Sequence, residues 1–133
     1  MMDWKYLISN KRFGQEDRAV YTDRARSDFQ KDYDRIIFSS PFRRLQNKTQ
    51  VFPLPGSVFV HNRLTHSLEV ASVSRSMGTI FHNLVQDETP DLLHEVPLIS
   101  EVGNIVAAAA LAHDLGNPAF GHSGEAAISR YFT

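Results

Sequence analysis

Apolar positions recur at helical spacing over two long stretches of the chain. In the first stretch, from Arg63 to about Val85, they are Leu64, Leu68, Ala71, Val73, Met77, Ile80, Phe81 and Leu84. This period predicts a long amphipathic helix. A second predicted helix begins at Pro97, and its apolar face is Leu98, Val102, Ile105, Val106, Ala109 and His113. Four alanines at 107–110 would let a neighbouring helix approach closely, because interaxial distance depends on side-chain size at the contact.

Shorter elements surround these two helices. Residues 34–48 predict two short helical pieces, and Ser40-Pro41 marks the start of the second. The segment 51–60 carries two prolines and a glycine between β-branched and aromatic residues, which predicts a small hairpin or an extended loop. Residues 86–95 read as a polar linker.

The end of the second long helix carries strong stop signals. Gly116 stands where a C-terminal cap belongs, and Pro118 prevents continuation. Ser123 can cap a third helix, which runs to the end of the chain. The sequence therefore predicts an all-α fold with at most one small β element, around 51–60.

Composition and length fit one soluble globular domain. The chain has 133 residues, of which 42% are hydrophobic, enough for one core. We expect residues 1–33 to form a polar arm with one short helix, and residues 34–133 to form the domain. The first ten residues lack the basic-then-apolar layout of a signal peptide, and no apolar run reaches membrane-spanning length, so we expect a cytoplasmic protein without membrane contact. Zero cysteines exclude disulfides and thiolate metal ligands.

Charge is distributed unevenly along the chain. Residues 1–63 hold 12 Lys and Arg against 7 Asp and Glu, whereas residues 64–133 hold 2 against 8. A basic first half is compatible with phosphate-bearing ligands or single-stranded DNA, although such asymmetry also arises from solvated faces.

A histidine–aspartate doublet ends the second long helix. His113 continues the apolar face of that helix, so it is either a buried, neutral, hydrogen-bonded histidine or a metal ligand. Asp114 follows directly, and both side chains can bend toward one ion at the helix end. If the two long helices pack antiparallel or cross steeply, His66 in the first turn of the other helix can meet them. Imidazole and carboxylate ligands suit divalent ions such as Mn, Fe, Ni, Zn or Mg.

Three stretches make this pattern more specific: "RRLQNKTQVFP", "RLTHSLEV" and "AHDLGNPAFGHSGE". Together they resemble the deoxyguanosine triphosphate triphosphohydrolase branch of the HD-domain metal phosphohydrolases, over residues 34–132. The resemblance implies hydrolysis of a deoxynucleoside triphosphate to the deoxynucleoside and inorganic triphosphate. It also implies a divalent metal, Mg or Mn first and Fe, Ni or Zn as alternatives, held by His66, His113, Asp114 and a later aspartate.

The resemblance assigns further roles residue by residue. His122 and Glu125 match a pair placed beside the α-phosphate for proton transfer; without it they read as a turn residue and a favourable charge at a helix N-terminus. Arg63 matches an arginine that contacts the triphosphate, and Gln50 a glutamine that lies against the deoxyribose. Lys48 and its neighbouring arginines can hold phosphate, face another subunit or be solvated.

The chain also departs from the family pattern, because no Asp follows Asp114. We expect an N-terminal piece of a larger enzyme, truncated at its C-terminus, with weak metal binding and poor catalysis. Its uncovered apolar faces favour a homo-oligomer. Two alternative functions remain open: another HD-type nucleotide phosphohydrolase, or a non-catalytic nucleotide- or single-stranded-DNA-binding module.

Overall fold

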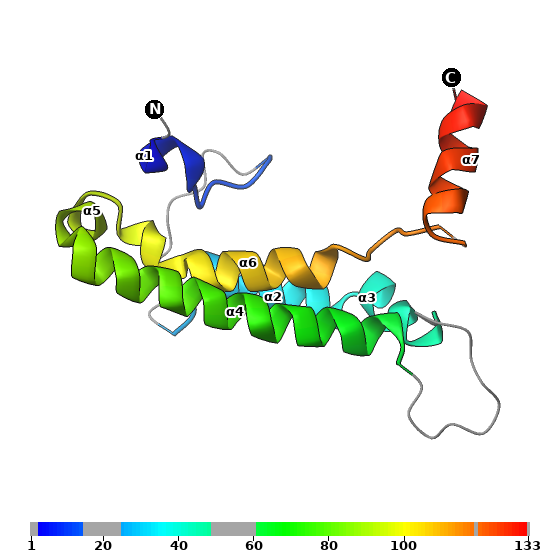
Figure 1. Cartoon of the computed structure of the whole chain (residues 1–133), viewed down its shortest axis with the longest axis horizontal. Coiled ribbons are helices and arrows are strands. Elements are labelled where there is room, and N and C mark those ends of the chain that lie inside the picture. Colours follow the sequence, from blue (N-terminus) through cyan, green and yellow to red (C-terminus); the bar gives the residue numbers. More distant parts are fainter. Residues whose placement is uncertain (1–2, 15–24, 49–60, 119, 133) are drawn as a thin grey trace.

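The computed structural model describes residues 3–14, 25–48, 61–118 and 120–132. Within these ranges every regular element is a helix, and the all-α prediction is confirmed (Figure 1). The hairpin or loop expected at 51–60 lies outside the described residues.

The elements follow one another in a simple order. They are α1 (Trp4–Leu7), α2 (Asp28–Phe38), α3 (Ser40–Arg44), the 3-10 helix η1 (Leu45–Asn47), α4 (Arg63–Glu88), α5 (Pro90–Glu95), the 3-10 helix η2 (Pro97–Glu101), α6 (Val102–Ala112) and α7 (His122–Phe132).

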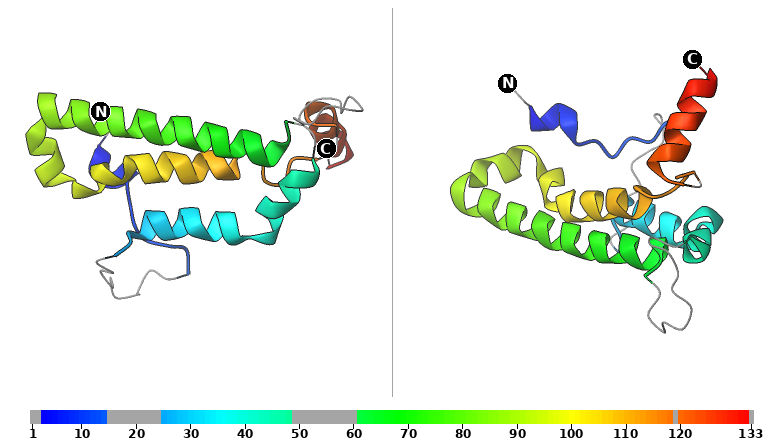
Figure 2. Two further views of the ribbon diagram at one scale, coloured as in Figure 1. Left: turned by 90° about the horizontal axis from the view of Figure 1, so that it is seen from below. Right: turned by 45° about the vertical axis from the view of Figure 1, so that its right-hand side comes forward.

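Helix α6 lies in the middle of the molecule. It packs antiparallel to α4 on one side and against α2 on the other (Figure 2). Helix α5 and η2 reverse the chain between α4 and α6, while α1 lies near this reversal, with Trp4 on Phe81 at 5.5 Å between ring centroids. Helix α7 projects away from the other helices (Figures 1 and 2). No helix in the described ranges is both long and apolar enough to cross a bilayer.

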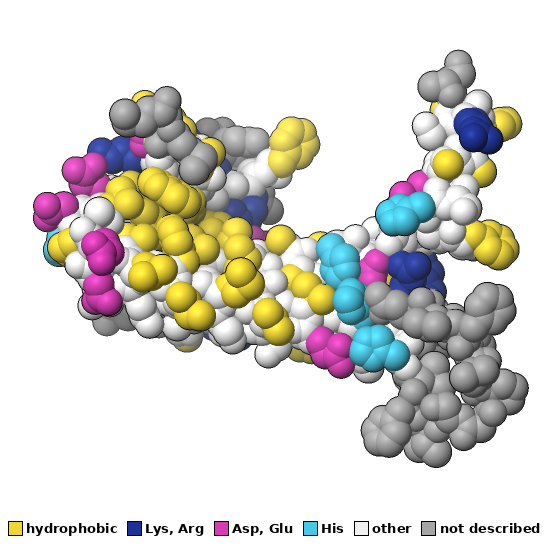
Figure 3. Space-filling model, in the orientation of Figure 1, with side chains coloured by type: hydrophobic (Ala, Val, Ile, Leu, Met, Phe, Trp, Pro, Cys, Tyr) yellow, Lys and Arg dark blue, Asp and Glu magenta, His cyan; other side chains and the backbone are white. Residues whose placement is uncertain are grey.

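The helix predicted from Arg63 to about Val85 is confirmed as α4, but its expected apolar face is largely wrong. The residues that α4 buries are Ser67, Ala71, Gly78 and Val85. Of the expected face, Leu68, Val73, Met77, Ile80 and Leu84 are exposed. The reason is the partner surface: α6 offers mainly small side chains, so a line of small residues on α4 packs closest. The large side chains of α4 form an apolar strip on the outer surface (Figure 3).

Helix α6 buries more of its circumference than a single apolar stripe predicts. Ala107, Ala108, Ala110 and Leu111 are buried, because α6 is covered on two sides. Ala109, expected in the core, is exposed, and so is His113, whose side chain is 40% exposed. The expectation that His113 points into the core is therefore wrong.

Closest approach of α4 and α6 occurs at two glycines. A Cβ built on Gly78 would lie 2.5 Å from Gly103 Cα and 2.8 Å from Gly103 N. No side chain fits in that space, so the backbones meet directly. A Cβ on Gly103 would instead meet its nearest neighbour, the Arg75 carbonyl oxygen, at 3.5 Å, which is ordinary contact.

Three local differences have simple causes. The expected polar linker at 86–95 is helical, because α4 continues to Glu88 and Pro90 begins α5 at a position that suits proline. Helix α2 begins at Asp28, inside the expected arm, because the Ser27 hydroxyl caps it by accepting from Gln30 N. Gly116, expected as the C-terminal cap, lies beyond it, because α6 ends at Ala112 and His113 is its C-cap; Gly116 adopts φ +82° in the turn that follows, the left-handed conformation that glycine tolerates best.

The two glycines provide a matched pair for testing the helix contact. Gly78→Ala forces α4 and α6 apart and should lower the free energy of unfolding by about 1–3 kcal/mol, the usual cost of overpacking. Gly103→Ala adds the same methyl group where there is room. It should be neutral or stabilising by up to about 1 kcal/mol, because alanine favours the helix. Urea unfolding followed by circular dichroism measures both; equal effects of the two substitutions would contradict the contact.

Candidate metal centre

His66 is positioned by the capped start of α4. Asn62 and Thr65 form a capping box: Asn62 Oδ1 accepts from Thr65 N at 2.9 Å, and Thr65 Oγ1 accepts from Asn62 N at 3.2 Å. This reciprocal pair fixes the first turn. His66 follows directly in that turn and is partly buried beside α6.

His113 and Asp114 stand at the C-terminal end of α6. His113 Nδ1 lies 2.6 Å from the Ala110 carbonyl oxygen. A carbonyl oxygen can only accept, so Nδ1 carries the hydrogen, and in the neutral ring Nε2 keeps its lone pair. Metal-binding histidines are commonly oriented in this way by a backbone carbonyl.

The antiparallel packing of α4 and α6 brings these residues together. One possible ligand atom from each of His66, His113 and Asp114 lies within 4.8 Å of the other two. The two imidazole rings are 5.4 Å apart at 70°, and His113 Nε2 is 3.5 Å from Asp114 Oδ2. In Figure 3 the histidine side chains gather at this end of the α4–α6 pair.

Asp114 is the buried residue of the cluster, at 5% exposure, and its two oxygens differ. Oδ1 accepts from Arg63 Nη1 at 2.8 Å and from Asn117 Nδ2 at 2.6 Å. Oδ2 is buried and has no hydrogen-bond partner. A buried carboxylate oxygen without a partner is costly, and a cation between it and the two imidazoles would satisfy it. The residues therefore fit a divalent metal ion.

Lys48 and Asn117 complete a closed ring of contacts around Asp114. The Arg63 amide donates to the Lys48 carbonyl at 3.0 Å, and the Lys48 ammonium donates to the Asn117 carbonyl at 2.9 Å. With the two hydrogen bonds on Oδ1, the ring links the chain before α4 to the turn after α6. It also places two cationic side chains beside the cluster.

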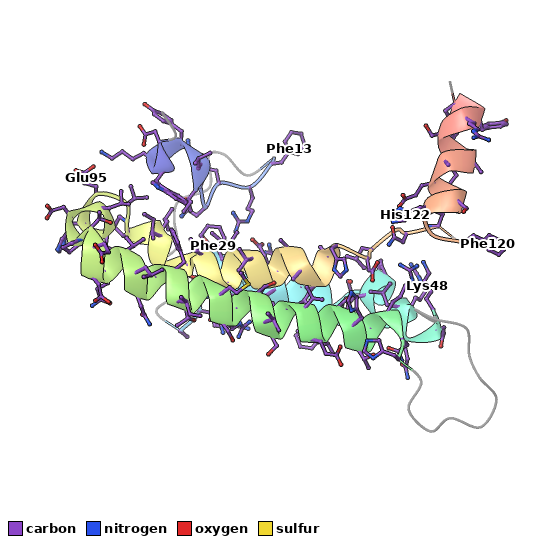
Figure 4. All side chains as sticks on the ribbon, viewed as in Figure 1. Phe13, Phe29, Lys48, Glu95, Phe120 and His122 are labelled. Carbon is purple, nitrogen blue, oxygen red and sulfur yellow. The ribbon has the colours of Figure 1, made fainter. Side chains whose placement is uncertain are left out.

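His122 and Glu125 form the expected pair but are not part of the ligand cluster. His122 Nδ1 lies 3.0 Å from Glu125 Oε2, in the first turn of α7. The His122 side chain is fully exposed at the base of the projecting helix (Figure 4). Gln50, expected to contact the sugar, lies outside the described residues.

Sequence reasoning missed three residues at this end of the molecule. Asn117 holds Asp114 Oδ1, and the signal was an amide three residues after the doublet, within the same turn. His61 and Glu69 lie on the other side of His66, and their ligand atoms are within 4.8 Å of a His66 nitrogen. The signal there was a second histidine just before α4 and a carboxylate one turn after His66.

Comparison with known proteins shows similarity over nearly the whole chain. The HD domain matches residues 63–133, a range that includes His66, His113 and Asp114. A Pseudomonas aeruginosa protein named deoxyguanosinetriphosphate triphosphohydrolase-like protein is 48% identical over 133 residues, covering 98% of this chain and 28% of that protein. A Listeria monocytogenes protein of the same name is 44% identical, with the same coverage.

A Serratia proteamaculans protein named deoxyguanosinetriphosphate triphosphohydrolase is 46% identical over 106 residues, covering 79% of this chain and 21% of that protein. The chain thus spans less than a third of the length of these relatives. Because the HD domain covers more than half of its residues, the chain belongs to the HD-domain family.

Proposed function

We propose that these residues form part of the active site of a metal-dependent deoxynucleoside triphosphate triphosphohydrolase, for which dGTP is the first substrate to test. Water attacks the α-phosphorus, the bond to the 5′-oxygen breaks, and the products are the deoxynucleoside and inorganic triphosphate. The buried, unpartnered Oδ2 of Asp114 beside two imidazoles carries the proposal. The names of the relatives support the choice of substrate.

His66, His113 and Asp114 are the proposed ligands of the ion, Mg²⁺ or Mn²⁺ in the first instance. A bound ion supplies Lewis-acid polarisation of a phosphate oxygen. The chain's own part is to hold the ligands ready: the Ala110 carbonyl orients His113, while Arg63 and Asn117 leave Oδ2 as the free oxygen of Asp114.

Arg63 and Lys48 are the proposed phosphate-binding cations. Arg63 donates one guanidinium N–H to Asp114. Because a guanidinium has five N–H donors, the others can bind phosphate oxygens. Lys48 is fixed through its contact with Asn117. Both positive charges stand where a triphosphate would approach the ligand cluster.

His122 is proposed to hold and move a proton at Nε2, since Glu125 faces Nδ1 and orients the ring. For this role α7 must bring the pair over the ligand cluster. Gln50 stays the predicted sugar contact. We expect the 133 residues alone to bind metal weakly and to turn over little substrate, because the described residues supply three ligands and the resemblance implies four.

Two further proposals concern partners. Exposed apolar side chains on α4 and α7, among them Met77, Ile80 and Ile128, support a homo-oligomer that covers them. Single-stranded DNA stays a predicted ligand of the basic first half; its binding should weaken as salt is raised and survive His113→Ala.

The reaction is tested on a protein of the relatives' length that contains these residues. Incubation with dGTP and Mn²⁺ should release deoxyguanosine and inorganic triphosphate, separated by ion-exchange chromatography. His113→Ala and Asp114→Asn should each abolish the release, because each removes a proposed ligand. Asn104→Ala, a substitution on α6 away from the cluster, should retain it.

Other products would decide against this assignment. Release of pyrophosphate or single phosphates would point to a different nucleotide phosphohydrolase. Full activity of His113→Ala would remove the ligand cluster from the reaction.

Asn117→Ala tests the arrangement around Asp114 separately. The substitution removes one of the two hydrogen bonds on Oδ1 and should weaken Mn²⁺ binding by about 10–100-fold, the usual effect of losing an outer partner of a metal ligand. Calorimetric titration with Mn²⁺ measures the affinity. Asn104→Ala, which removes an amide bonded to Glu101 instead, should leave the affinity unchanged; unchanged affinity in Asn117→Ala would contradict the role.

A further inference from the structure

We propose that His61, His66 and Glu69 form a second divalent-cation site on the outer side of α4, which competes with the candidate metal centre for His66. His61 and Glu69 have no role in the proposed catalytic arrangement, whereas His66 belongs to both groups. The existence of the second site does not depend on the reaction proposed above, although its consequence for metal loading does.

The local backbone brings the three side chains together. His66 and Glu69 are three residues apart on α4, so they share one face of the helix. The cap residue Asn62 is extended, with φ −107° and ψ 168°, and His61 precedes it. The His61 and His66 rings are 6.1 Å apart at 63°, and His61 Nε2 is 3.4 Å from Glu69 Oε2.

The donor set suits zinc. Two imidazoles and one carboxylate are the ligands of many open zinc sites, where water fills the remaining position. The side chains of His61 and Glu69 are 50% and 62% exposed, so an ion there would keep water ligands. Asp114 differs, because Arg63 already neutralises one side of that carboxylate. Glu69, by contrast, forms no ion pair with an arginine in the part of the chain that the structure describes.

His66 belongs to both groups, and this makes them exclusive. A neutral imidazole has one nitrogen with a free lone pair, so His66 can bind one ion at a time. A zinc ion bound by His61, His66 and Glu69 would occupy His66. The candidate metal centre would then lack one of its ligands. Excess zinc should then inhibit the Mg²⁺- or Mn²⁺-dependent reaction without binding at His113 or Asp114.

Calorimetric titration of the whole chain with zinc chloride at neutral pH tests the site without any activity measurement. The unmodified chain should bind one zinc ion. His113→Ala, which disables the inner group, should still bind one. In that background, His61→Ala and Glu69→Gln should each weaken binding at least about tenfold, since losing even an outer partner of a ligand has such an effect.

His94→Ala in the same background is the matched control, because it removes another exposed histidine and should change nothing. The substituted side chains at 61 and 69 are exposed, so circular dichroism should show unchanged helix content. Loss of all zinc binding in His113→Ala alone would overturn the proposal. Unchanged zinc affinity when His61→Ala or Glu69→Gln is added to His113→Ala would also overturn it. Two zinc ions bound per unmodified chain would show that the two groups do not compete for His66.

The zinc result and the proposed reaction can fail independently. His61→Ala alone, made in a protein of the relatives' length, should be less inhibited by excess zinc while still releasing triphosphate from dGTP. Absence of triphosphate release would count against the reaction, whereas unchanged zinc inhibition would count against the outer site.

Discussion

Close approach of the α4 and α6 backbones is the constraint on which the rest of the structure depends. Gly78 and Gly103 meet without intervening side chains, and a line of small residues continues the contact toward Ala71 and Ser67. His66 directly precedes Ser67 in the first turns of α4, and the doublet stands at the end of α6. A wider helix separation would draw His66 away from His113 and Asp114.

Asp114 converts this proximity into a defined site. Its two oxygens differ: Oδ1 accepts hydrogen bonds from Arg63 at the start of α4 and from Asn117 in the turn after α6, whereas Oδ2 has no hydrogen-bond partner. The same contacts reach Lys48, so the segment before α4 and the turn after α6 are fixed relative to each other. Asp114 and the nearby cationic side chains are therefore positioned by one network.

Much of this arrangement is predictable from sequence because its signals are local. Apolar periodicity predicts α4, and the antiparallel option places His66 near Asp114. The buried face of α4 is not predictable in the same way, because large apolar side chains normally rank above serine and glycine for burial. The alanine-rich surface of α6 reverses that order at Ser67 and Gly78. The role of Asn117 likewise depends on a tertiary contact that spacing alone does not reveal.

The unpartnered oxygen of Asp114 bears on the stability of the fold as well as on ion binding. A buried polar atom without a partner costs about 1–3 kcal/mol in the ion-free chain. The other oxygen, Oδ1, is satisfied by Arg63 and Asn117, so the cost falls on one side of the carboxylate. An ion that satisfied Oδ2 would therefore stabilise the folded chain, because it would bind the folded state and not the unfolded one.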